Sequence, residues 1–248
     1  MKGVSVKLHG WMEIVRPPNL FTIPGDILAG ALLSGITLIQ WPSLIIIIIC
    51  SLFLYAAGLI LNDYFDREND KEERPDRPLP SGRVNAPSAL FGSVALFVFA
   101  GLLGFFLNDS VFTFPLTVTI IVLIIIYNCF ARRVPIPGFI VMGLCRGFNL
   151  LLGASVGTGA FTPIVIGAAG LETVYITILT VVAFHEIKFK NVKLIEQMIR
   201  GLIFLQIFFV FIAMLKSGGN PVKYIIVILI MIVLFYISKL FAKKYYGS

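Results

Sequence analysis

The residues best suited to chemistry lie in one polar segment, Asn62 to Val84, which reads NDYFDRENDKEERPDRPLPSGRV and directly follows an apolar run. If the helix predicted for that run continues through the segment, Asn62, Asp66 and Asp70 occupy positions i, i+4 and i+8. They then lie on one face, about 6 Å apart along the axis, with Asp63 beside them. Carboxylates this close repel one another unless a cation lies between them. Hard oxygen ligands in a row suit Mg²⁺.

Arginines accompany these acids, and forked guanidinium donors match the oxygens of phosphate groups. Together, acids for a metal and arginines for phosphate predict a diphosphate-binding site. The alternative is a solvated loop of mixed charge that is stiffened by prolines. The acids begin directly at the end of an apolar helix, and this position favours a functional role. The arginines of the segment are Arg67, Arg74, Arg77 and Arg83.

The pattern N-D-x-x-D-x-x-x-D followed by R-P-x-R-P-L-P-S-G resembles the first aspartate-rich motif of the UbiA superfamily of intramembrane prenyltransferases. The resemblance implies that Asn62, Asp66 and Asp70 hold Mg²⁺ on the diphosphate of an isoprenyl donor, with Asp63 as a catalytic residue beside them. It implies transfer of the prenyl group to an aromatic or lipophilic acceptor within the membrane. Arg74 and Arg77 would bind the diphosphate.

Composition agrees with a membrane setting. The chain has 248 residues, of which 58% are hydrophobic and 13% charged, and its mean hydropathy is +0.95. These values predict a polytopic membrane protein. The net charge of +7 does not indicate a nucleic-acid partner, because Lys and Arg gather in the cytoplasmic loops of membrane proteins. We expect no removable signal peptide, and we expect the cysteines to be packing residues.

Apolar runs of about 20 residues predict an all-α bundle of eight helices around a central cavity open to the cytoplasm. The family usually has nine, so one helix is either lacking or merged with another. The chain is expected to form a single domain, 1–248, containing the segment 62–84. Nearly all Lys and Arg residues fall on the side of the membrane that holds the N-terminus; the exceptions are Lys216, Lys223 and Arg146, which lies within a span. This excess predicts that both termini and segment 62–84 lie in the cytoplasm, at the inner cell membrane. The expected spans are 19–39, 42–61, 87–107, 111–130, 138–157, 163–184, 195–215 and 222–241.

Arg146 is expected about 12 Å inside the fifth span. A charge at that depth is costly unless it faces a partner or a watery cavity, which makes Arg146 a candidate catalytic residue. It could equally hold helices together by pairing with Asp26 or Glu172. Nearby, Gly143 and Gly147 form a G-x-x-x-G face that predicts close helix packing. The surrounding MGLCRGFNLLLG also resembles a UbiA-like branch from Ebo gene clusters, which is linked to the handling of secondary-metabolite precursors.

Basic residues follow the fourth and sixth spans. Arg132 stands where the family often has a Lys, which implies contact with the diphosphate, although a basic pair after a span also fits the charge bias of cytoplasmic loops. After the sixth span, FHEIKFKNVK replaces the second aspartate-rich motif of the family and keeps only Glu186, a candidate catalytic acid. Lys188 and Lys190 would bind the diphosphate in place of a second metal. Alternatively, prenyl transfer is lost and the protein binds or transports a lipid-like precursor.

Overall fold

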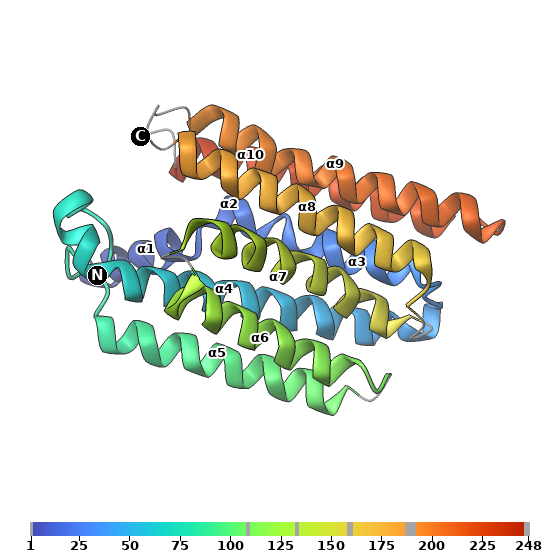
Figure 1. The fold of residues 1–248 in the computed structure, drawn as a ribbon, viewed down its shortest axis with the longest axis horizontal. Coiled ribbons are helices and arrows are strands. Elements are labelled where there is room, and N and C mark those ends of the chain that lie inside the picture. The colour runs from blue at the N-terminus through green and yellow to red at the C-terminus, as the bar shows by residue number, and fades with distance from the viewer. Residues whose placement is uncertain (1, 108–109, 132–133, 158–160, 187–191, 246–248) are drawn as a thin grey trace.

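The computed structural model describes residues 2–107, 110–131, 134–157, 161–186 and 192–245. Within these ranges the chain is helical, and no strand occurs. The long helices run side by side along the longest axis of the molecule (Figure 1). After the N-terminal helices α1 (Lys2–Val15), α2 (Pro17–Leu20) and α3 (Ile23–Leu33), the elements are η1 (Leu38–Gln40), α4 (Trp41–Glu73), α5 (Ala86–Phe106), α6 (Thr113–Cys129), α7 (Pro135–Val156), α8 (Pro163–Glu186), α9 (Val192–Ser217) and α10 (Val222–Tyr245).

Helix α4 carries the polar segment. Its 33 residues run without interruption from Trp41 to Glu73, so the axis is about 50 Å long. That length exceeds the roughly 30 Å of bilayer hydrocarbon, which lets the polar last turns extend beyond an apolar span. The expectation that Asn62–Asp70 continues the preceding helix is therefore confirmed.

Each expected span contains a helix, but the first is broken. In place of one helix over 19–39, a four-residue α2 is followed after Phe21 and Thr22 by the 11-residue α3. Pro24 lies in the first turn of α3, where its missing N–H costs nothing, and Gly35 follows the helix end in the left-handed region at φ 85°. In the described chain six helices are long and apolar enough to cross a membrane, and α6 is shorter. Eight spans thus remains a prediction.

Helix α7 lies at the centre of the bundle, between α3, α6 and α8 (Figure 1). Glycines permit its backbone to approach two neighbours. A Cβ at Gly143 or Gly147 would overlap the backbone oxygens of α8, which confirms the close packing predicted for this G-x-x-x-G face. On the other side of α7, a Cβ at Gly153 would overlap the Ile27 carbonyl of α3. These contacts fix the height of Arg146, on α7, relative to Asp26, on α3.

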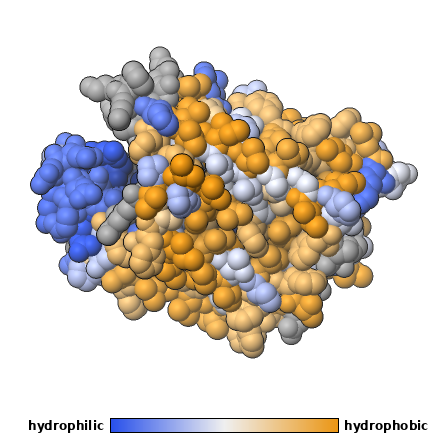
Figure 2. Space-filling view, in the orientation of Figure 1, coloured by the Kyte–Doolittle hydropathy of each residue, from blue (hydrophilic) through white to orange (hydrophobic). Residues whose placement is uncertain are grey.

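The polar chemistry gathers at one end of the bundle. There lie α1, the connection between α4 and α5, and the C-terminal end of α10 (Figure 1). The surface of this end is strongly hydrophilic, whereas the visible sides of the helices are mostly hydrophobic (Figure 2). A small buried cluster of Ile14, Ile60, Leu79 and Val84 holds the α4–α5 connection against α1. The cytoplasmic assignment of this end remains a prediction from the distribution of Lys and Arg.

Candidate active site

A polar pocket of about 820 Å³ lies at the end of α4. Asn62, Asp66 and Asp70 all line it, as their spacing on one helix face predicts. Arg74 and Arg77 line it as well, because the α4–α5 connection folds back over the last turns of α4. The structure therefore brings five residues predicted for metal and diphosphate binding to a single pocket.

Ion pairs set the positions of the acids. Nη1 of Arg77 lies 2.9 Å from Oδ2 of Asp70 and 3.6 Å from Oδ1 of Asp63. Nη2 of Arg16 lies 2.9 Å from the same Asp63 oxygen. Asp63 is buried and lines neither pocket described here, so its contacts place it behind the pocket wall, where it holds two arginines.

Two other arginines of the segment lie outside the pocket lining. The guanidinium of Arg67 lies 4.2 Å from the ring centroid of Tyr64 and donates a hydrogen bond of 2.7 Å to the Tyr64 carbonyl. Arg83 binds Glu13 of α1 through Nη1 at 2.7 Å. Arg67 therefore stabilises its own helix. The ion pair of Arg83 holds the α4–α5 connection against α1.

The oxygen ligands that line the polar pocket suit Mg²⁺, although they supply only part of its coordination shell. Among the described residues, no group of three or more His, Cys, Asp or Glu side chains is arranged to hold a metal ion alone. Mg²⁺ is usually bound through one or two carboxylates together with substrate phosphates and water. The amide of Asn62 and the carboxyl groups of Asp66 and Asp70, facing one pocket with room for a phosphate ligand, meet that requirement.

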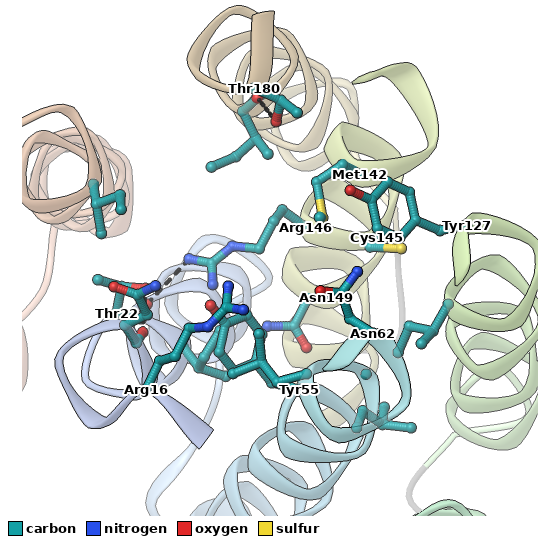
Figure 3. Close-up of a pocket in the computed structure, with 18 of the residues that line it drawn as sticks. Arg16, Thr22, Tyr55, Asn62, Tyr127, Met142, Cys145, Arg146, Asn149 and Thr180 are labelled. Carbon is teal, nitrogen blue, oxygen red and sulfur yellow. Dashed lines mark hydrogen bonds between the residues drawn. The ribbon is translucent and has the colours of Figure 1, made fainter. Parts of the chain in front are cut away.

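A second, mostly apolar cavity of about 340 Å³ continues inward from the polar pocket. Arg16, Asn62 and Tyr127 line both spaces, so the two meet at these side chains. Leu54, Ile120 and similar side chains from the surrounding helices form most of the inner wall. Figure 3 shows Arg16, Asn62 and Tyr127 reaching this cavity from different elements. The arrangement suits an amphiphilic ligand with a charged head and an apolar chain.

Arg146 projects across the inner part of this cavity toward α3 (Figure 3). Its Nη2 lies 2.9 Å from Oδ1 of Asp26 and donates a hydrogen bond of 3.2 Å to the carbonyl of Thr22. Glu172 lies farther away, with Oε1 4.0 Å from Nη2. Arg146 therefore faces the cavity and pairs with Asp26, and the predicted reach to either acid is confirmed.

The contacts of Asp26 include residues that sequence reasoning missed. Asn149 donates a hydrogen bond of 2.8 Å to Oδ2 of Asp26, and Gln206 of α9 donates to Oδ1. Their only sequence signal is a polar side chain within an apolar helix.

Arg16 was also missed, and its backbone is in the left-handed region at φ 47°, ψ 68°. Its position directly before Pro17 and Pro18 is the one signal in the sequence.

Residues 26–248 match the model of the UbiA prenyltransferase family. The chain belongs to this family. It is also similar to the digeranylgeranylglyceryl phosphate synthase of Methanothrix thermoacetophila, 35% identical over 142 residues that cover 57% of this chain and 52% of that protein. The synthase of Pyrococcus furiosus is 32% identical over 167 residues, covering 66% and 57%. The chain spans about half the length of the curated relatives it matches.

Solved structures share the fold. A UbiA homologue from Archaeoglobus fulgidus bound to DMAPP and Mg²⁺ superposes with a TM-score of 0.61 and 15% identity, over 92% of this chain and 86% of that one. A structure of a digeranylgeranylglyceryl phosphate synthase gives 0.59 and 21%, over 96% and 88%. Together with the apolar helices, family membership makes this UbiA protein an integral membrane protein.

Four predicted site residues of this UbiA chain remain. Arg132, Lys188 and Lys190 lie outside the described residues. Glu186 is the last residue of α8. Their roles stay predictions from the sequence.

Proposed function

We propose that this UbiA protein transfers a prenyl group from an isoprenyl diphosphate to a lipophilic acceptor, with Mg²⁺ bound at Asn62, Asp66 and Asp70. One observation supports the proposal most: a polar pocket of acids and arginines opens through Asn62 onto an apolar cavity. The first space suits a diphosphate and the second an isoprenoid chain. Mg²⁺, when bound, would supply positive charge to the phosphate oxygens.

In the proposed reaction, the bond between the prenyl C1 atom and the diphosphate oxygen breaks, and its electron pair stays on the diphosphate. Arg74 and Arg77 donate hydrogen bonds to the oxygens that gain this charge, which stabilises the transition state. Asp63 acts as a positioning residue, because it binds Arg77 and Arg16 from behind the pocket. Arg132, Lys188 and Lys190 add positive charge in this proposal, and Glu186 accepts a proton.

The acceptor then forms a bond to C1 and loses one proton. Apolar side chains around the cavity exclude water, so the acceptor rather than water captures the allylic carbon. The relatives are named for a glyceryl phosphate that carries two geranylgeranyl groups, which favours a lipid-like hydroxyl compound as the acceptor over an aromatic one. The membrane supplies such compounds directly to a protein buried in it.

The test is turnover by the purified protein in detergent with Mg²⁺ and ¹⁴C-labelled geranyl or geranylgeranyl diphosphate. We expect label to enter a lipid-soluble product and diphosphate to be released in equal amounts when a lipid extract is added. Diphosphate binding that depends on Mg²⁺ but yields no product with any extract would contradict catalysis. It would instead favour the second candidate, a protein that binds or carries a lipid-like precursor, which the lysines in place of second-motif acids support.

A further inference from the structure

The inner end of the apolar cavity is polar. Ser51, Thr22, Arg146 and Asn149 line it there, whereas Asn62 lies at the junction with the polar pocket. Ser51 and Asn62 are eleven residues apart on α4, so about 16 Å along the helix axis separates the two polar regions. A ligand that only buried an isoprenoid chain would have no use for charged and polar groups at that depth, where they are costly.

The hydrogen bonds at this inner end leave one donor group incompletely used. Asn149 is committed on both sides, because its Nδ2 donates to Asp26 and its Oδ1 accepts from Ser51 at 2.6 Å. Both hydrogen bonds that Arg146 donates to described residues instead use Nη2. Its Nε–H, which has almost no accessible surface of its own, has no partner among the described residues, and the side chain, nine-tenths buried, lines the cavity. The guanidinium therefore retains hydrogen-bonding capacity beside the cavity.

The charges around Arg146 select the kind of group that it can bind. Asp26 and Glu172 are both completely buried next to this one guanidinium. An anionic ligand would bring a further negative charge to a cation that is already paired. A neutral oxygen, as in a carbonyl, hydroxyl or ether, accepts from the guanidinium without that repulsion.

We propose that the inner end of the cavity is a subsite for a neutral, hydrogen-bond-accepting oxygen on the lipophilic acceptor, with Arg146 as the donor. Identifying the ligand as the acceptor rests on the proposed function. The subsite itself concerns binding alone. It implies that a phosphate on the acceptor, if present, lies at the outer end, near Arg74 and Arg77, and not at Arg146.

The experiment compares three probes of similar shape: menadione, which carries two neutral carbonyl oxygens, 2-methylnaphthalene, which carries none, and the anion 2-naphthoate. Each competes against ³H-menadione for the purified full chain in detergent, with empty micelles as the blank. We expect menadione to bind at least about 10-fold more tightly than 2-methylnaphthalene, the ratio that one hydrogen bond to a charged donor gives. We expect 2-naphthoate to bind no better than the hydrocarbon.

Two variants assign that preference to Arg146. The double variant Asp26→Asn/Arg146→Gln removes both charges at similar side-chain size, and the menadione preference should fall to about 1. Arg146→Lys keeps a charge opposite Asp26 but lacks the Nε–H donor of the guanidinium, so the preference should fall there too, even if the double variant does not fold. Ser93→Ala is the matched control, because Ser93 is buried, bonds the Ala57 carbonyl at 2.9 Å and lines neither cavity.

Equal binding of menadione and 2-methylnaphthalene by the wild-type chain would overturn the proposal. An unchanged preference in the folded Arg146 variants, or tightest binding of 2-naphthoate through Arg146, would also overturn it. Turnover of ¹⁴C-labelled geranyl diphosphate with Mg²⁺ and a lipid extract, measured on the same preparations, separates this outcome from the proposed function. Absence of the probe preference in the wild-type chain with donor turnover intact refutes the subsite alone, and a clear wild-type preference without any turnover refutes catalysis alone.

Discussion

Arg77 donates a hydrogen bond of 2.9 Å from Nη1 to Oδ2 of Asp70, seven residues earlier in the chain. The same nitrogen lies 3.6 Å from Asp63, so one guanidinium offsets the repulsion between two carboxylates of a single helix. Asp70 is thereby held at the wall of the polar pocket, and Arg77 becomes the residue that links the metal-binding face to the phosphate-binding connection.

The acids of α4 provide the first prediction. Asp66→Ala, Asp66→Asn and Asp70→Asn should each reduce Mg²⁺-dependent binding of geranyl diphosphate by 10-fold or more, a change of about 1.4 kcal/mol. The Asn variants should fail because the negative charge, and not only the shape, balances the cation. Isothermal titration in detergent measures this. Glu72→Gln is the control, since Glu72 is exposed on the same helix and lines neither pocket. Unchanged affinity in the three Asp variants would refute the assignment.

Arg77 provides the second prediction. Arg77→Gln should weaken diphosphate binding with and without Mg²⁺, because it removes a forked donor from the pocket and leaves Asp63 and Asp70 less well paired. Arg67→Gln should bind the diphosphate normally, because Arg67 contacts Tyr64 instead of lining the pocket. The two variants carry the same change of charge, so equal losses would show that only net charge matters.

The buried ion pair provides the third prediction. Arg146→Met should destabilise the folded protein by about 3–5 kcal/mol, since it leaves the buried Asp26 without its counter-charge. Glu172→Gln should be tolerated far better, because it removes one of two carboxyl groups next to a single guanidinium. Unfolding followed by tryptophan fluorescence in detergent compares them. A larger loss for Glu172→Gln than for Arg146→Met would show that Glu172 is the principal partner.

The altered second motif provides the fourth prediction. With Glu186 among Lys188 and Lys190 where the family has several acids, we expect one Mg²⁺ site, because lysines repel a second dication. Metal titration of donor binding should fit a single site. Lys188→Gln and Lys190→Gln should weaken donor binding more than Glu186→Gln does. Two Mg²⁺ ions in a donor-bound structure, the second on Glu186, would contradict this prediction.

Membrane orientation provides the fifth prediction. Single cysteines at Ser217 and Ser248, in a chain whose own cysteines are replaced, should react with a membrane-impermeant maleimide from opposite sides of sealed vesicles. The expectation follows from the excess of Lys and Arg on the side that holds the N-terminus. Reaction of both positions from one side would contradict it.

The sequence alone determined those features that depend only on residues close together along the chain. The i, i+4, i+8 spacing of Asn62, Asp66 and Asp70 places them on one face of any helix, and α4 is a continuous helix through all three. The apolar runs likewise placed the helices, because the length and composition of a span depend on consecutive residues. The break between α2 and α3 was missed, since an apolar run does not report a change of backbone direction within it.

The tertiary structure decided every contact between distant parts of the chain. The sequence offered both Asp26 and Glu172 as partners for Arg146, and helix packing chose Asp26 at 2.9 Å over Glu172 at 4.0 Å. Arg16 reaches Asp63 across 47 positions. The spacing of residues along one helix fixes their face but not which helix that face meets. That choice depends on close backbone approach, as at Gly153 against Ile27, and on pairing buried charges, as between Arg146 and Asp26.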